Sequence, residues 1–318
     1  MFLLFPGIPR FDQNSFMAVN REENMKGEEL HYEGIIIRPP SEAQSIILQV
    51  TIGCSHNKCT FCGTYKGVRF RIKDEDIIEK DIILASREFP FLRRVFLCDG
   101  DALIMPQKKL VWILQLIRKH MPWIQRVGLY GNAKSILRKS PSELEELRDL
   151  GLGIIYLGVE SGDKETLQAV RKGVTPERMI EAGRRVKEAG ITLSVTVLLG
   201  IAGIERSLEH ARATGWILSE IDPHYVGALT LMILPNTPLG EDYINGLFKM
   251  PDPKGLLLEL REMLVHTNLS RGLFMSNHAS NYLPLKVRFP KGKEEAIKAI
   301  DAALRGEIAL KPEWLRAL

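Results

Sequence analysis

Three cysteine thiols fall within nine residues of this sequence, at Cys54, Cys59 and Cys62. Two residues separate Cys59 from Cys62, a spacing that lets both sulfurs reach one metal centre. Thiolates are soft ligands that select zinc or iron–sulfur clusters. A 4Fe–4S cluster ordinarily takes four cysteines, so three neighbouring thiols would leave one iron with an open coordination position. An open position on a metal is a site for chemistry, whereas a closed one is structural.

The main alternative to a cluster is a structural zinc site that His56 completes. Zinc ligands usually come as two separated pairs, whereas here the fourth ligand would lie inside a tight loop. The sequence therefore favours an iron–sulfur cluster, and we interpret His56 as a surface residue of the loop. The fourth cysteine of the chain, Cys98, stands alone and is predicted to be a small buried residue of a strand.

A repeating framework is predicted to position these residues. From about residue 45, short β-rich runs are each followed by a helical pattern, which indicates an α/β fold with a parallel sheet. Six such units fit either a doubly wound sheet or an incomplete barrel, and both place function at the carboxyl ends of the strands. The predicted strands cover 46–52, 93–97, 126–130, 153–159, 192–199 and 225–233. The predicted helices cover 74–87, 107–119, 141–150, 164–171, 176–189 and 206–219.

Several strand ends carry polar or glycine-rich segments. With Phe61 just before the last cysteine of the loop, these segments give the chain a resemblance to the radical S-adenosylmethionine (SAM) superfamily over roughly residues 35–238. The usual spacing in that superfamily has three residues between the first two cysteines, and this chain has four. The resemblance implies an incomplete (βα)6, TIM-like barrel in which Cys54, Cys59 and Cys62 hold a 4Fe–4S cluster.

The resemblance also implies which residues contact SAM. The segment Asp99-Gly100-Asp101 looks like the Gly-Gly-Glu segment that holds the SAM amino group, and it departs from that pattern at two positions. Glu160 matches a carboxylate beside SAM in relatives similar to oxygen-independent coproporphyrinogen dehydrogenase and the methylthiotransferases. The segment with Gly200 and Gly203 resembles one that lies against adenine. The implied SAM contacts are Phe61, Asp99, Gly100, Asp101, Asn132, Glu160, Ser194, Gly200 and Gly203, with Asn132 and Ser194 toward the ribose.

Three regions are predicted along the chain. They are an N-terminal extension at 1–44, the barrel at 45–240 and a helical and loop segment at 241–318 that covers the barrel. In the last region, helices are predicted at 253–270 and 293–304. A polar stretch at 276–282 is either a gate over the barrel or a hydrogen-bonded loop.

Composition narrows the class of protein further. The 318 residues are 45% hydrophobic and 26% charged, which excludes disorder for the bulk of the chain. The formal net charge of +4 is too small to imply nucleic acid or a membrane surface by itself. Apolar runs are shorter than the roughly 18–20 residues that span a bilayer, and the first residues lack a basic signal region. We expect a cytoplasmic protein.

These observations predict a radical SAM enzyme. The expected reaction is reductive cleavage of SAM at the cluster to a 5′-deoxyadenosyl radical, which abstracts hydrogen from a small-molecule substrate. The expected partner is a low-potential electron donor of the flavodoxin or ferredoxin type, with no membrane and no nucleic acid. Two alternatives stay open: a non-catalytic protein that binds a cluster and SAM, and a radical SAM enzyme that modifies protein or RNA.

Overall fold

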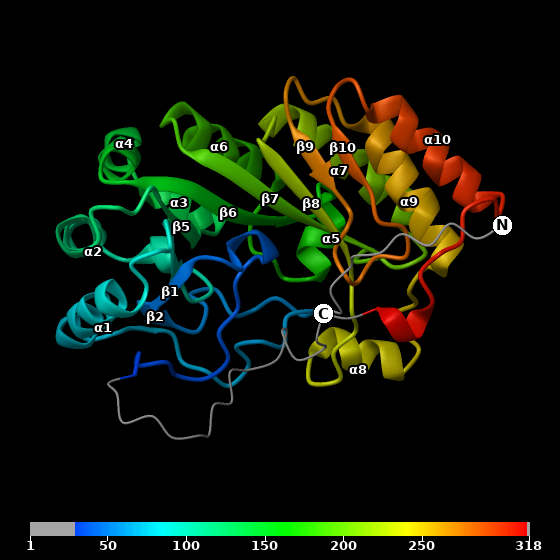
Figure 1. The fold of residues 1–318 in the computed structure, drawn as a ribbon. Coiled ribbons are helices and arrows are strands. Elements are labelled where there is room, and N and C mark those ends of the chain that lie inside the picture. Colours follow the sequence, from blue (N-terminus) through cyan, green and yellow to red (C-terminus); the bar gives the residue numbers. More distant parts are fainter. Residues whose placement is uncertain (1–28, 317–318) are drawn as a thin grey trace, which may run out of the picture.

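A curved eight-stranded sheet forms the centre of the computed structural model, which describes residues 29–316 (Figure 1). Its order is β1-β4-β5-β6-β7-β8-β9-β10, and every neighbouring pair up to β9 is parallel. The first six strands are the predicted ones, with ends within about three residues except where the first strand breaks after Gln49. They are β1 (Ile46–Gln49), β4 (Arg94–Cys98), β5 (Arg126–Tyr130), β6 (Leu152–Glu160), β7 (Thr192–Leu199) and β8 (Tyr225–Thr230).

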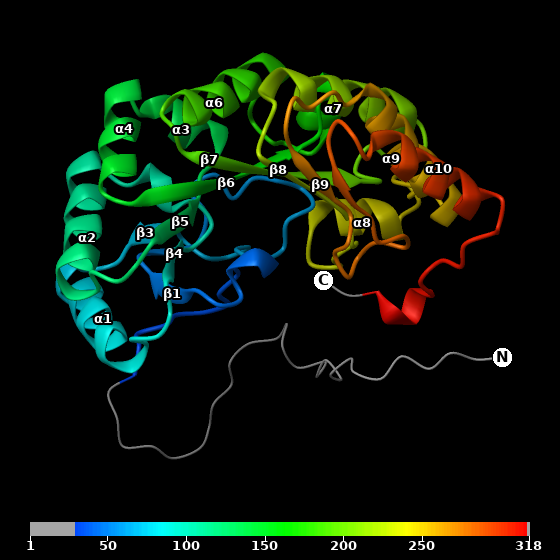
Figure 2. The same cartoon turned by 45° about the horizontal axis from the view of Figure 1, so that its top comes forward.

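Helices cover the convex side of this sheet, so the strands form the inner wall of a half-barrel (Figure 2). Local sequence sets where they begin: Ser140 and Glu143 form the capping box of α4, and the Thr175 side chain caps α6. The predicted helices are α1 (Glu75–Glu88), α2 (Gln107–His120), α4 (Pro141–Asp149), α5 (Lys164–Ala169), α6 (Pro176–Glu188) and α7 (Ser207–Ile221). A short helix, α3 (Ala133–Arg138), was not predicted.

The two faces of the sheet are buried differently. On β7, Val195 and Val197 are fully buried under the helices, whereas Ser194 on the opposite face is half-buried. At β1, β4 and β6 the inner face is filled by an apolar cluster that includes Phe96, whose ring meets that of Tyr156 edge-on at 5.8 Å. The interior is therefore packed beside the early strands and lined by smaller residues at β7. Cys98 is buried in this packing, as predicted.

The C-terminal segment extends the sheet as well as covering it. Helices α9 (Pro253–His266) and α10 (Lys293–Leu304) match the prediction, and α9 packs against α7. Two strands were not predicted: β9 (Leu273–Met275) adds parallel to β8, and β10 (Lys286–Arg288) pairs antiparallel with β9. Strands of three residues are too short to give a periodic signal, which explains the omission. The short helices α8 (Pro238–Ile244) and η4 (Glu313–Leu315) complete this region.

Residues 1–28 of the N-terminal extension predicted at 1–44 lie outside the described residues. The described part runs alongside β1, where the Tyr32 hydroxyl donates to the carbonyl of Ile47 at 2.8 Å. It ends in the short helix η2 (Pro40–Glu42), and the fully buried Glu42 accepts a hydrogen bond from Arg126 at 2.5 Å. These contacts close the amino end of the barrel. No helix among residues 29–316 is long and apolar enough to cross a membrane.

Candidate cofactor site

The three clustered cysteines lie on one clamped loop at the carboxyl end of β1. Strand β2 (Thr51–Ile52) pairs antiparallel with β3 (Arg71–Ile72), and this pairing closes the loop of residues 53–70. Cys54, Cys59 and Cys62 are all free and half-buried on this cysteine loop. Phe61 is half-buried beside them. The predicted thiol loop is thus a formed element with fixed ends.

Hydrogen bonds to the α5–α6 connection and to the start of α8 fix the position of the cysteine loop. The Thr60 amide donates to the carbonyl of Val170 at 3.0 Å, and the Thr60 carbonyl accepts from the Leu239 amide at 3.0 Å. A ring nitrogen of His56 lies 2.8 Å from the carbonyl of Arg171. His56 therefore faces the α5–α6 connection, and its observed partner is a backbone carbonyl.

The chemistry of the thiols fits an iron–sulfur cluster. Burial raises the pKa of Cys54, and it raises the pKa of Cys59 to about 11. Without a metal these thiols hold their protons, and a metal centre would displace them. Within residues 29–316, no three His, Cys, Asp or Glu side chains are grouped to hold a metal ion. The fit therefore rests on three soft donors, unpaired in disulfides and clustered on one loop.

Asp99, after β4, braces the start of the cysteine loop. Its carboxylate is almost fully buried and accepts hydrogen bonds from the Gln49 amide at 3.1 Å, the Gly53 amide at 3.3 Å and the Tyr65 hydroxyl at 3.3 Å. A Cβ added at Gly100 would lie 2.7 Å from the Tyr65 ring, so only glycine fits there. The predicted segment thus lies directly against the loop.

Asp101 has a similar role on the next turn. Its Oδ2 accepts hydrogen bonds from Asn132 Nδ2 at 2.6 Å, from Ser135 Oγ at 2.6 Å and from the hydroxyl of Ser55 on the cysteine loop. Within residues 29–316, its Oδ1 accepts a hydrogen bond only from the Asn132 amide, at 3.2 Å. Burial raises the pKa of Asp101 to about 6, although hydrogen bonds from Ser135 and Ser55 oppose the rise. Asn132 also caps α3, so its side chain is already engaged.

Glu160 lies at the end of β6, where the register shifts and its φ is +62°. Lys172 Nζ lies 2.8 Å from its carboxylate, and both side chains are largely buried. Burial lowers the pKa of Lys172, but the Glu160 carboxylate and the Cys59 thiol outweigh this effect and the pKa is raised. Lys172, the charge partner of the predicted carboxylate, was not among the predicted site residues. Lys172 lies in the short turn Arg171–Gly173, which matches no recognisable sequence motif.

Gly200 and Gly203 form the turn after β7, with φ of +82° and +67°. The Gly200 amide donates to Glu259 Oε1 on α9 at 2.6 Å, and the Ser207 hydroxyl donates to the other carboxylate oxygen of Glu259. Glu259 is fully buried. The glycine turn is therefore held by a residue of the C-terminal segment, 59 positions along the chain.

The same carboxylate belongs to a longer buried network. Glu259 Oε1 lies 3.4 Å from a ring nitrogen of His210 on α7. The other ring nitrogen of His210 lies 2.7 Å from the hydroxyl of Ser161, which directly follows Glu160. All three side chains are fully buried. Nε2 of His210 makes no hydrogen bond within residues 29–316, so Glu259 meets it by proximity alone, and the group brings the ends of β6 and β7 together. No local sequence pattern indicates this group, because its members lie 49 residues or more apart.

The polar stretch 276–282 is a hydrogen-bonded loop at the end of β8. Asn281 donates to the carbonyl of Ala228 at 2.8 Å and accepts from the Thr230 hydroxyl at 2.8 Å. The guanidinium of Arg316 lies 4.1 Å from the Tyr282 ring centre and fastens the loop to the chain end. Of the two interpretations left open, these bonds support the second.

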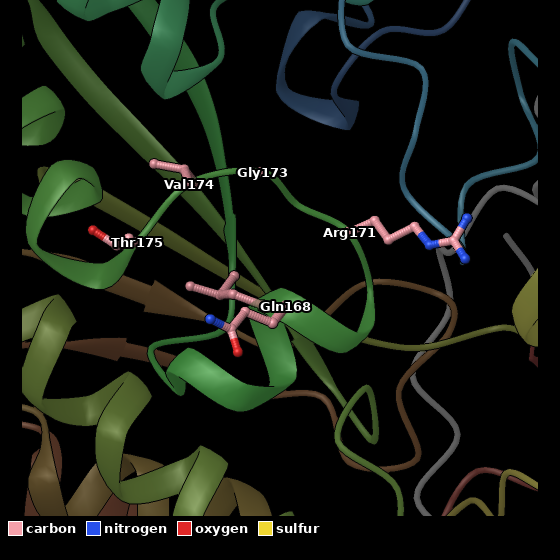
Figure 3. Close-up of a pocket in the computed structure, with 6 residues that line it drawn as sticks. Gln168, Arg171, Gly173, Val174 and Thr175 are labelled. Atoms are coloured by element: carbon pink, nitrogen blue, oxygen red, sulfur yellow. The ribbon is translucent and has the colours of Figure 1, made fainter.

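A separate cavity of about 350 Å³ opens beside the α5–α6 connection (Figure 3). Its lining residues are Leu167, Gln168, Arg171, Gly173, Val174 and Thr175. In Figure 3, Arg171 points away from Val174 and Thr175. The cysteines, Glu160 and the glycine turn do not line it, but Arg171 and Gly173, which contact His56, do, so the cavity adjoins the cysteine loop from the side of α5.

The structure is a half-barrel of parallel strands whose carboxyl ends carry a three-thiol loop, buried carboxylates and a glycine turn. Residues 48–212 match the family model described as the radical SAM superfamily, and the chain belongs to this superfamily. The cofactors of this superfamily, and of this chain as a member of it, are a 4Fe–4S cluster and SAM.

Similar proteins agree on the family and differ in their chemistry. The chain is 23% identical to 4′-phospho-dehydrooxetanocin synthase of Priestia megaterium, over 71% of this chain and 34% of that protein. It spans about half or less of the length of the first curated relatives. Among solved structures, the cobalamin-dependent SAM radical enzyme OxsB superposes with a TM-score of 0.53 at 18% identity, over 69% of this chain and 41% of that one. Coproporphyrinogen III oxidase of Escherichia coli gives 0.51 at 15% identity, over 70% and 51%. These structures show the fold.

Proposed function

We propose that Cys54, Cys59 and Cys62 hold the 4Fe–4S cluster of this enzyme and that SAM binds between the cysteine loop and the carboxyl ends of β4, β6 and β7. The carrying observation is that two buried carboxylates, Asp99 and Asp101, brace the thiol loop from the end of the neighbouring strand β4. When bound, the cluster and SAM supply reductive cleavage to a 5′-deoxyadenosyl radical, which removes a hydrogen atom from the substrate.

The residues of the chain then have distinct tasks around SAM. Asp99 and Asp101 fix the cysteine loop, and Asp101 Oδ1 keeps an acceptor position for the SAM amino group. Lys172, paired with Glu160, offers a cation to the SAM carboxylate. The turn of Gly200 and Gly203 lies against adenine. Ser194 and Asn132 are the proposed ribose contacts, although the Asn132 side chain is less available because it caps α3. Phe61 and Gly100 are proposed to line the SAM site beside the cysteine loop.

The inner face of the barrel supports a small-molecule substrate. Beside Ser194, the residues Thr196 and Gly227 on the same face of β7 and β8 are half-buried and small. Small side chains leave room, and their hydroxyls can orient a polar molecule without adding charge. The reaction also needs one electron from a low-potential donor, for which we propose a flavodoxin or ferredoxin.

Anaerobic reconstitution with iron and sulfide tests the ligand assignment. The wild type should show 4Fe–4S absorbance and an EPR signal after reduction, and it should form 5′-deoxyadenosine from SAM with dithionite. Cys59→Ala should lose both signals, whereas Cys98→Ala, at a buried cysteine away from the loop, should keep them. An unchanged cluster signal in Cys59→Ala contradicts the assignment. Binding of SAM without cleavage in the wild type favours the non-catalytic alternative.

A further inference from the structure

Positive charge is concentrated around the cysteine loop. Residues 51–73, 131–139 and 170–175 together carry ten Lys and Arg residues and no Asp or Glu. The whole chain has 43 basic and 39 acidic residues, so the remaining residues carry 33 basic and 39 acidic ones, a net charge of −6. Three of the ten cations pair with carboxylates outside these segments (Arg71 with Glu33, Lys73 with Asp81 and Lys172 with Glu160), so the local surplus of positive charge rests on the other seven.

The structure brings these three segments together around His56. A Cβ at Gly173 would lie 2.7 Å from the His56 ring and 2.8 Å from Lys134 Nζ, so α3, the cysteine loop and the α5–α6 connection meet there. A ring nitrogen of His56 also lies 2.8 Å from the carbonyl of Arg171, which directly precedes Lys172.

Four side chains of this region form what we call the basic face: Lys58, Lys134, Arg138 and Arg171. All four are exposed, and none has an ion-pair partner within residues 29–316. Lys134 and Arg138 lie one turn apart on α3, so they project from the same side of that helix. Unpaired cations on one face attract an acidic surface and raise its rate of encounter.

We propose that the basic face is the docking surface for an acidic, low-potential one-electron carrier protein. This inference rests on the proposed function, which requires one electron at the cluster. Lys58 and His56 lie between Cys54 and Cys59 in the loop, so a protein bound there is separated from the thiols only by the thickness of the loop. The reduced carrier gives up one electron, the cluster gains one, and no proton moves.

The position of the face favours a carrier over RNA. The basic face is built from the cysteine loop, α3 and the α5–α6 connection, and none of its four side chains lies on β7 or β8, which carry Ser194 and Gly227. A substrate must instead reach the inner face of the barrel near Ser194. Nucleic acid bound to the basic face would not present a base there. Electron-transfer complexes also need only small interfaces, which a face of four cations can supply.

The test is direct binding of an oxidised acidic flavodoxin to the cluster-loaded enzyme, measured calorimetrically at 20 mM and 300 mM salt. The variant Lys58→Glu/Lys134→Glu/Arg171→Glu should lose at least tenfold in affinity at low salt, and Lys134→Glu alone should lose less in the same direction. A matched control reverses three exposed cations elsewhere, Lys254→Glu/Lys291→Glu/Lys298→Glu, and should stay within twofold of the wild type. High salt should weaken wild-type binding and reduce the difference, because it screens the charges.

The kinetic counterpart is 5′-deoxyadenosine formation driven by reduced flavodoxin or by reduced methyl viologen, a small cation. The basic-face variant should lose the flavodoxin-driven rate at least tenfold and keep the viologen-driven rate. Equal flavodoxin affinity in the basic-face and control variants overturns the proposal. So does a basic-face variant that loses binding of transfer RNA in a gel shift but binds flavodoxin normally. If the wild type forms no 5′-deoxyadenosine with viologen, the proposed function fails, while the binding measurement still decides the docking surface.

Discussion

Glu259 gives the sharpest test of how the C-terminal segment supports the site. This buried carboxylate on α9 accepts hydrogen bonds from the Gly200 amide at 2.6 Å and from the Ser207 hydroxyl, and it faces His210 at 3.4 Å. Glu259→Ala removes the acceptor for both donors in a site without solvent. Hydrogen bonds to a charged group contribute roughly 1.5–3 kcal/mol each, so we expect a loss of about 4 kcal/mol in the free energy of unfolding.

The conservative variant Glu259→Gln should lose less of the free energy of unfolding than Glu259→Ala. Glu259→Gln keeps the volume and one acceptor oxygen, and the Ser207 hydroxyl can turn to accept from the new amide. Only the charge-assisted part is lost, so we expect about 1–2 kcal/mol. The control lies on the same helix: Glu262 pairs with the exposed Arg212 at 2.6 Å, and Glu262→Ala should cost below about 1 kcal/mol.

Thermal unfolding of the three variants measures these losses, and SAM affinity measured on cluster-loaded protein tests the consequence for the site. Glu259→Ala should lower the midpoint by roughly 6 °C, and Glu262→Ala by about 1 °C. Glu259→Ala should weaken SAM binding because the Gly200 turn loses its acceptor, and Glu259→Gln should weaken it less because one acceptor oxygen remains. If Glu259→Ala unfolds like Glu262→Ala, the buried network does not hold the turn and the argument is refuted.

Two further predictions concern charge near the strand ends. Lys172→Met leaves the largely buried Glu160 carboxylate without its partner, so it should reduce the free energy of unfolding by about 3 kcal/mol and weaken SAM binding. The double variant Lys172→Met/Glu160→Gln should recover stability, measured by calorimetry, but not SAM affinity, measured by titration. Recovery of both would contradict the proposed SAM contact. Partial burial raises the pKa of Asp163, but hydrogen bonds from Arg206 and Thr166 outweigh it and leave the pKa at about 2. Because this folded-state value is below the ordinary 3.8, the stabilisation is present above about pH 4 and is lost as the pH falls toward 2. Urea unfolding of Asp163→Asn should show a deficit of about 1–2 kcal/mol at pH 7 that shrinks below pH 4, and a deficit independent of pH would be inconsistent with this assignment.

Local features of the sequence predicted the framework well. Apolar periodicity and helix caps such as Ser140 with Glu143 depend on residues a few positions apart, so the βα units are legible along the chain. The three-residue strands β9 and β10 carry too few residues for a period and form only because β8 offers them an edge. The short α3 was missed although Asn132 caps it, because one cap before six residues is a weak signal.

The sequence by itself determined the chemistry of the thiol loop. Cys54, Cys59 and Cys62 are neighbours in the chain, so no folding is needed to see that one loop carries three soft ligands. The residues that support this loop are distant from it in the sequence. Glu259 reaches Gly200 over 59 positions, and Asp101 reaches Ser55 over 46. Only the tertiary structure decided such pairs, because hydrogen bonds between buried groups depend on how the strands and helices pack, which residue order alone does not specify.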